Sequence, residues 1–177
     1  MSFSVTILGS SSAKPTLSRH PSAQAVNVHE QYYLVDAGEG VQQQLIRCGI
    51  TPLKLRAVFI SHLHGDHVFG LIGLISSFGM LNRTADLHIH AATDLEKIMQ
   101  PQLDFFCEEL PFKVIFHHIN PRTHELIHED RSVQVYSIPL KHRVPSCGFL
   151  FREKARDRHI RRDMIDFYNI PTWRIPK

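Results

Sequence analysis

Four potential metal ligands fall within six consecutive residues, in the run His-x-His-x-Asp-His at 62–67. The apolar residues 55–60 before this run predict a short strand, and the almost uniformly apolar residues 68–81 after it predict a buried helix. The run therefore follows the end of a strand, which is where functional side chains converge in layered α/β folds. This feature constrains the fold of the chain more than any other.

The spacing within the run allows its side chains to meet. In an extended segment alternate side chains point the same way, so His62, His64 and Asp66 can converge. A turn at Gly65 can then bring His67 beside them. Imidazole and carboxylate groups suit zinc, and four of them exceed what one tetrahedral ion takes while keeping an open position. We therefore predict two adjacent metal ions, although an isolated His-x-His would be no more than a common surface pattern.

Two residues outside the run can join this site. His142 directly follows the predicted strand 133–140, and spacing alone leaves it either a further ligand or an ordinary polar residue. Asp36 lies at a strand end before the turn Ala-Gly-Glu-Gly, where it can cap the next helix or hold a ligand imidazole. The other histidines have no ligand spacing, and we interpret most of them as partly exposed polar residues: His20, His29, His88, His90, His117, His118, His124, His128 and His159.

The hydrophobic pattern along the chain predicts an α/β layered sandwich. Helices are expected at 39–48 and 68–81, and a third begins at the capping box Thr93-Asp-Leu-Glu96, where Pro101 should kink or divide it. Strands are expected at 3–8, 25–28, 32–35, 55–60, 87–91, 112–119, 133–140 and 148–151.

Composition excludes several classes of protein. With 177 residues, 43% hydrophobic and 21% charged, the chain fits one globular domain. It has neither an apolar run of membrane-spanning length nor the pattern of a secretory leader. Its three cysteines are widely spaced and form no Cys-x-x-Cys. We expect a cytoplasmic protein without a membrane partner, a disulfide framework or a thiolate zinc site.

Basic residues gather near the C-terminal end. Residues 141–177 contain ten Lys and Arg against four Asp and Glu, whereas residues 1–140 have a net charge of −3. Such a segment either attracts a polyanion or is the solvated face of a helix.

The motif resembles the signature of the metallo-β-lactamase superfamily. The wider run 59–74, together with 36–42 upstream, is similar to the ribonuclease Z family of tRNA 3′-processing endoribonucleases. Residues 14–19 and 139–149 match that family in order and spacing. His20 departs from it, because the family usually has Asn at this position.

This resemblance implies a metallo-β-lactamase-type four-layer αββα sandwich, of which the chain supplies mainly the N-terminal half. It implies that His62, His64 and His142 bind a first zinc ion and that Asp66 and His67 bind a second. Asp66 would also accept a proton from the attacking water. The implied reaction is hydrolysis of one phosphodiester of precursor tRNA, which removes the 3′ trailer and leaves a tRNA 3′-hydroxyl. Paired zinc ions would activate the water and neutralise the phosphate oxygens.

The resemblance also divides the chain. Residues 1–151 correspond to the N-terminal part of the metallo-β-lactamase-like domain, and residues 152–177 correspond to the start of a protruding basic arm. The arm would bind tRNA through Arg156, Arg158, Arg161 and Arg162, and the family is expected to form homodimers.

The family's later part supplies a carboxylate that bridges both metals, a histidine that protonates the leaving oxygen and a last histidine ligand. None has a counterpart in these 177 residues. We therefore expect the first zinc site to bind better than the second.

Two other functions stay open. The chain can be a metallo-β-lactamase-fold hydrolase of a small phosphodiester or other ester, or a non-catalytic fragment that binds RNA or dimerises. Two bound zinc ions would favour catalysis, and one or none would favour a fragment. If each half of the sandwich contributes one sheet, strands 55–60, 112–119 and 133–140 would present an apolar face without an internal partner. Self-association is then expected.

Overall fold

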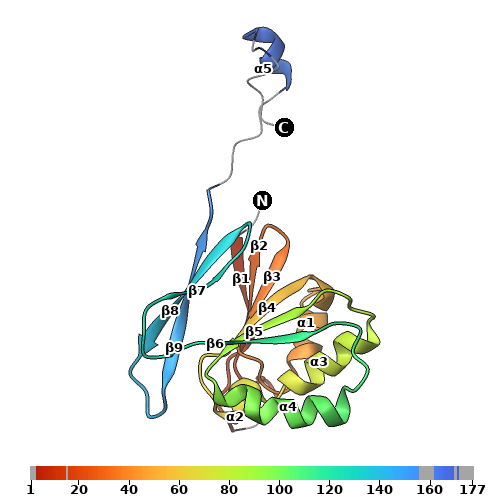
Figure 1. Cartoon of the computed structure of the whole chain (residues 1–177), viewed down its shortest axis with the longest axis vertical. Helices are drawn as coiled ribbons and strands as arrows, with labels where there is room; N and C mark the ends of the chain where they lie inside the picture. Colours follow the sequence, from red (N-terminus) through yellow and green to blue (C-terminus); the bar gives the residue numbers. More distant parts are fainter. Residues whose placement is uncertain (1–2, 15, 156–161, 170, 172–177) are drawn as a thin grey trace.

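The computed structural model describes residues 3–14, 16–155, 162–169 and 171, and contains two β-sheets (Figure 1). The first sheet has the order β1-β2-β3-β4-β5-β6, with β1 to β3 antiparallel and β3 to β6 parallel. The second sheet is antiparallel, in the order β7-β8-β9. The strands are β1 (Phe3–Gly9), β2 (Ala23–Val28), β3 (Gln31–Val35), β4 (Leu55–Phe59), β5 (Leu87–Ala91), β6 (Val114–His118), β7 (Leu126–Glu129), β8 (Val133–Leu140) and β9 (Ser146–Glu153).

Helices cover one face of the first sheet, and the second sheet lies on the other side (Figure 1). The described residues therefore form three layers, in the order helices, sheet, sheet. No helix in the described ranges is long and apolar enough to cross a membrane. The helices are α1 (Val41–Arg47), the 3₁₀ turn η1 (Pro52–Lys54), α2 (Gly65–Val68), α3 (Leu71–Met80), α4 (Asp94–Phe106) and α5 (Arg162–Phe167).

The two cores follow from the alternation of side chains along the strands. In β4, Val58 packs into the core between the helices and the first sheet, whereas Phe59 packs between the two sheets. In α3, the four buried residues have the helical spacing of one apolar face: Leu71, Leu74, Ile75 and Phe78. The predicted buried helix is thus confirmed as a core element.

That helix is divided, which the sequence pattern did not predict. The prediction was one helix over 68–81, but α2 ends at Val68 and α3 begins at Leu71. The break brings Gly70 against the turn after β3, where its N–H donates to the carbonyl of Ala37 at 2.9 Å. A Cβ atom at Gly70 would lie 2.1 Å from the Gly38 carbonyl oxygen, so only glycine permits this approach.

Helix α4, by contrast, is continuous, although Pro101 was expected to kink or divide it. It runs from Asp94 to Phe106 with Pro101 inside it. Pro101 is exposed, so its ring points away from the core. Its missing N–H therefore costs a hydrogen bond without ending the helix.

The second sheet corrects the expectation of an uncovered inner face. Tyr33, Ala57 and Phe59 of the first sheet are fully buried with Val133 and Val135 of β8. The chain therefore supplies one sheet and also part of the second, because residues 126–153 form β7, β8 and β9, which pack over β3 and β4. The sequence pattern missed β7, a short strand of four residues.

The β1 side of this inner face stays open. Phe3, Val5 and Ile7 lie opposite β2 residues of the inter-sheet side, yet they are 45%, 53% and 59% exposed. Beyond β9, which continues to Glu153, Figure 1 shows α5 away from both sheets.

Candidate metal centre

The candidate site lies where several connections between strands and helices meet. His62 and His64 lie between β4 and α2, and His142 lies in the connection between β8 and β9. The N–H of Cys147 at the start of β9 donates to the Ser61 carbonyl at 3.1 Å. This hydrogen bond ties the second sheet to the motif loop of the first. It explains how a residue 80 positions later in the sequence reaches the motif.

Three imidazole rings converge at this place. One ring nitrogen from each of His62, His64 and His142 lies within 4.8 Å of the other two. The His62 Nε2 and His64 Nδ1 atoms are 3.1 Å apart, and the ring centroid of His142 is 5.0 Å from that of His62. The structure thus brings together the three residues that were expected to form a first metal site. Their donor set fits zinc, because zinc favours imidazole nitrogen and needs no thiolate.

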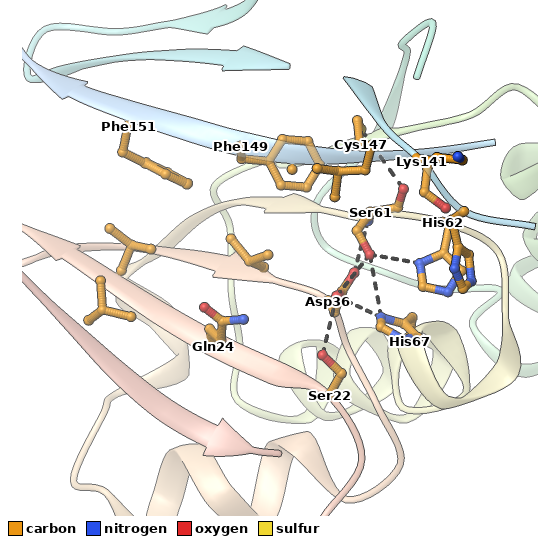
Figure 2. Close-up of a pocket in the computed structure, with 17 residues that line it drawn as sticks. Ser22, Gln24, Asp36, Ser61, His62, His67, Lys141, Cys147, Phe149 and Phe151 are labelled. Carbon is orange, nitrogen blue, oxygen red and sulfur yellow. Dashed lines mark hydrogen bonds and ion pairs between the residues drawn. The ribbon is translucent and has the colours of Figure 1, made fainter. Parts of the chain in front are cut away.

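Asp36 fixes the neighbouring part of the site (Figure 2). Asp36 is 3% exposed, and its carboxylate accepts hydrogen bonds from the Ser61 N–H at 2.8 Å and the Ser61 hydroxyl at 3.0 Å. It also lies 2.7 Å from His67 Nδ1. Because Nδ1 must donate to this carboxylate, the neutral ring of His67 keeps its free lone pair on Nε2. Of the two sequence interpretations, a capping role has no support in the structure, because the cap of α1 is Gly40 and has no side-chain hydrogen bond.

Asp66 lies beside the same ring. Its Oδ2 atom is 3.6 Å from His67 Nε2, and both side chains are largely buried. The two residues expected to form a second metal site are therefore adjacent, and the ring of His67 is 4.0 Å from that of His62 between centroids.

The site favours different charge states for its histidines. Burial, together with the nearby His67 and His64 rings, lowers the pKa of His62 to about 4. Burial also disfavours the charged form of His67, but the hydrogen bond and charge of Asp36 outweigh it and raise its pKa. His62 is consequently neutral near pH 7, which is the form that can donate to a metal.

A cavity of about 510 Å³ adjoins these residues, between the two sheets (Figure 2). Asp36, Ser61 and His62 lie at its polar end, and Phe149 and Phe151 lie along its apolar part. Its volume is that of an ordinary ligand pocket.

Sequence analysis missed the serines that support Asp36. Ser61 donates twice to the carboxylate, and the Ser22 hydroxyl donates once at 3.3 Å. Ser61 directly precedes the motif at a strand end, which is the signal that could have drawn attention to it.

A second group of histidines lies on three neighbouring strands. His88 and His90 on β5 face His117 on β6, and His128 on β7 lies across from His90. His90 is 2% exposed, so the interpretation of these residues as partly exposed was wrong for it. The alternation Leu-His-Ile-His-Ala in β5 places both histidines on one face, and this pattern was visible in the sequence.

Of the four predicted tRNA-binding arginines, one lies in a described element. Arg156, Arg158 and Arg161 lie outside the described residues, and Arg162 is the first residue of α5.

Comparison with known proteins decides the family. A family model described as Anti-Pycsar protein Apyc1 matches residues 3–160. The chain belongs to this family. Its curated relatives include ribonuclease Z of Phocaeicola vulgatus, 52% identical over 98% of this chain and 56% of the relative, and ribonuclease Z of Porphyromonas gingivalis, 48% identical over 98% and 57%. The chain thus resembles the N-terminal part of ribonuclease Z, as the motif suggested, and spans a little over half the length of these relatives.

Solved structures confirm the metallo-β-lactamase fold. The short form of human tRNase Z superposes with a TM-score of 0.77 at 29% identity, over 86% of this chain and 66% of that one. The metallo-β-lactamase fold protein YhfI of Bacillus subtilis has a TM-score of 0.62 at 22% identity, over 92% and 66%, and shows the fold alone.

Proposed function

We propose that the chain is the N-terminal, metal-holding part of a zinc-dependent endoribonuclease that removes the 3′ trailer from precursor tRNA and leaves a tRNA 3′-hydroxyl. The convergence of His62, His64 and His142 carries this proposal. The curated relatives named ribonuclease Z support the substrate, because they match nearly the whole chain at about half identity.

Each residue of the site has a distinct role in this proposal. His62, His64 and His142 hold the first zinc ion, and Asp66 and His67 contribute to a second. Bound zinc would supply Lewis-acid activation of water and neutralise charge on the phosphate. Asp36 orients His67 through the 2.7 Å contact to Nδ1. Asp66 accepts a proton from the attacking water, as a carboxylate that lies within the site can.

The partners follow from the same proposal. Precursor tRNA is the substrate, and Arg156, Arg158, Arg161 and Arg162 in the 152–177 arm bind its phosphates, beyond the catalytic part at 1–151. The ten basic residues after position 140 support this, because phosphate contacts dominate nucleic-acid affinity. We further propose a homodimer located in the cytoplasm.

One observation favours a second candidate, a hydrolase of small phosphodiesters. The matching family model has the name of a different protein, Anti-Pycsar protein Apyc1. The fold alone does not distinguish these substrates, since one fold hosts many activities.

The test uses a fusion of this chain to the part of the Phocaeicola vulgatus relative that lies beyond the matched region. We expect the fusion to cleave a 3′-extended tRNA just after the discriminator nucleotide and to leave a 3′-hydroxyl. His64→Ala should abolish cleavage, whereas His118→Ala, an exposed histidine paired with Glu96, should retain it. A folded, zinc-loaded fusion that hydrolyses bis(p-nitrophenyl) phosphate but leaves the tRNA intact would favour the second candidate.

A further inference from the structure

A smaller cavity adjoins the metal centre on the side of the β8–β9 connection. It has a volume of about 250 Å³ and lies between that connection, residues 141–145, and the segment from β6 to β7. Figure 2 shows Lys141 at the same end of the larger cavity as His62. Four residues line both cavities: Leu140, Lys141, His142 and Ser146. A group bound in the smaller cavity would therefore lie beside His142 of the metal centre.

The side chains around this cavity are basic. Arg122, Lys141 and Arg143 line it and are exposed, and no Asp or Glu among the described residues does so. None of the ion pairs that the described residues form includes any of the three. Their positive charges are therefore available to an anionic ligand.

Two of these charges lie where they oppose the binding of a metal ion. Lys141 and Arg143 are the neighbours in sequence of His142, one of the three converging histidines. A cation at His142 is repelled by an ammonium and a guanidinium group on the adjacent residues. An anion that lies against both the metal and these side chains offsets the repulsion. The arrangement therefore fits a metal centre whose substrate is an anion.

Both walls of the cavity are held in place by hydrogen bonds. In the β8–β9 connection, the Ser146 hydroxyl donates to the Val144 carbonyl at 2.9 Å. The Ser137 hydroxyl on β8 donates to the Thr123 carbonyl at 2.7 Å, which ties the segment that contains Arg122 to the second sheet. Three prolines among the lining residues restrict the backbone further: Pro121, Pro139 and Pro145. A cavity formed in advance lowers the entropy cost of binding a ligand.

The chemistry of the cavity suits a single phosphate group. Guanidinium groups bind phosphate oxygens through paired charge-assisted hydrogen bonds, and lysine binds them as a point charge. The volume is smaller than that of an ordinary ligand pocket, and His142 is the one aromatic ring among the described lining residues. A backbone phosphate therefore fits this cavity better than a whole nucleotide does.

We propose that Arg122, Lys141 and Arg143 bind a backbone phosphate of the RNA that flanks the cleaved phosphodiester. The inference rests on the proposed function, because it assigns a position to one phosphate of that substrate. The three residues are positioning residues. They hold the strand so that the phosphodiester to be cleaved lies at the metal centre, and they take no part in the chemistry.

The test measures binding of the zinc-loaded chain to a 3′-extended tRNA in salt from about 0.05 to 0.2 M. The triple variant Arg122→Gln, Lys141→Gln, Arg143→Gln should weaken binding about tenfold. It should also reduce the slope of log affinity against log salt by about 0.7, the value for one phosphate of a single strand. The charge-keeping variant Arg122→Lys, Lys141→Arg, Arg143→Lys should retain the wild-type slope.

A chemical change in the RNA locates the bound phosphate. The 3′-extended tRNA is made with an uncharged methylphosphonate in place of the phosphate on one side or the other of the cleaved bond. For the wild type, one of the two substitutions should weaken binding about as much as the triple variant does. The same substitution should have little further effect on the triple variant, because both changes remove the same contact.

A matched control separates this contact from general attraction between the chain and RNA. Arg131 is also an exposed arginine, but it precedes β8, whereas Lys141 and Arg143 follow the other end of that strand. Arg131→Gln should leave both the affinity and the salt slope unchanged. Zinc content after dialysis should not fall in any variant, which shows that His142 is still in place.

Each other outcome overturns the inference in a recognisable way. If the triple variant binds with the affinity and slope of the wild type, the phosphate site is wrong and the proposed function stands. If Arg131→Gln has the same effect as the triple variant, or if neither methylphosphonate weakens wild-type binding, the three residues attract RNA without holding a particular phosphate. If the wild type does not prefer 3′-extended tRNA to a plain RNA duplex of equal length, the proposed function fails and the phosphate site fails with it.

Discussion

At the scale of single residues, the Asp36 carboxylate holds two parts of the site together. It accepts from both donors of Ser61, which precedes the first motif histidine, and it pairs with His67 at the other end of the motif. The φ angle of Asp36 is +60°, a strained value for a residue with a side chain. The hydrogen bonds of this carboxylate offset that strain.

Asp36→Asn should therefore weaken the site without destroying the fold. The amide keeps one acceptor oxygen but loses the charge that orients His67. We expect the zinc affinity to fall about 10- to 100-fold and the unfolding free energy to fall by about 1–3 kcal/mol. Zinc titration and urea unfolding measure these effects. Asp94→Asn, an exposed carboxylate paired with Lys97, is the control, and an unchanged zinc affinity in Asp36→Asn would contradict the role of Asp36.

His90 is a residue whose burial makes the fold sensitive to acid. Its ring stacks on Phe59 at 4.7 Å and on His117 at 4.5 Å, and both of its nitrogens are buried without a hydrogen-bond partner among the described residues. Burial, together with the facing His128, His117 and His88, lowers the pKa of His90 to about 3. The folded state thus resists a proton that the unfolded chain accepts near pH 6.5.

The stability of the wild type should consequently fall as the pH drops below about 6.5 and continue to fall toward pH 3. We expect a loss on the order of 1 kcal/mol per pH unit in this window. His90→Leu should flatten this dependence and raise the unfolding free energy at pH 7 by about 1–2 kcal/mol, because it removes two unpaired polar atoms. Urea unfolding at pH 7, 6, 5 and 4 measures both effects. If His90→Leu loses stability on acidification as steeply as the wild type and the exposed control His118→Leu do, the acid dependence arises from other groups.

At the scale of elements, local sequence patterns predicted whether a segment is a helix or a strand. Contacts between segments distant in sequence decided where a helix breaks and where a site residue lies. The apolar runs of β4 and α3 are local signals, so both elements were predicted. The break at Gly70 depends on contact with Gly38, and the position of His142 depends on the hydrogen bond between β9 and Ser61. Neither contact has a local signal, so spacing left His142 undecided and only the family resemblance indicated it.

Helix α4 offers a test of how far proline weakens an element that still forms. Pro101 is exposed and leaves the Lys97 carbonyl without its helical donor. Pro101→Ala should restore that hydrogen bond and raise the unfolding free energy by about 1–3 kcal/mol. Pro52→Ala is the matched control: Pro52 begins η1, where no N–H is needed, so its loss should be neutral or slightly destabilising. A thermal unfolding midpoint unchanged by Pro101→Ala would mean that α4 bends to compensate.

At the scale of the whole molecule, the open face of β1 remains the feature to explain. Phe3, Val5 and Ile7 form an apolar row on an edge strand that the second sheet does not cover. Such edges normally pair or are covered. The expected self-association therefore moves from the whole inner face to this strand.

The double variant Val5→Thr, Ile7→Thr keeps side chains that favour strands and removes apolar surface. We expect the wild type to self-associate at micromolar concentration and the variant to have a dissociation constant roughly tenfold higher. Sedimentation equilibrium measures both. Ile46→Thr, which changes an exposed isoleucine on α1, is the control. A monomeric wild type, or an equal effect of Ile46→Thr, would remove β1 as the contact.

The central claim is that His62, His64 and His142 of this chain form a metal site. Three imidazoles and a water complete one tetrahedral zinc, whereas Asp66 and His67 alone leave a second ion weakly held. The most direct measurement is the zinc retained per chain after dialysis, by elemental analysis, for the wild type, His64→Ala and the control His118→Ala. The account predicts about one zinc in the wild type and the control and none in His64→Ala. The claim is contradicted if His64→Ala retains its zinc in full. It is also contradicted if the wild type holds no zinc or two tightly bound zinc ions.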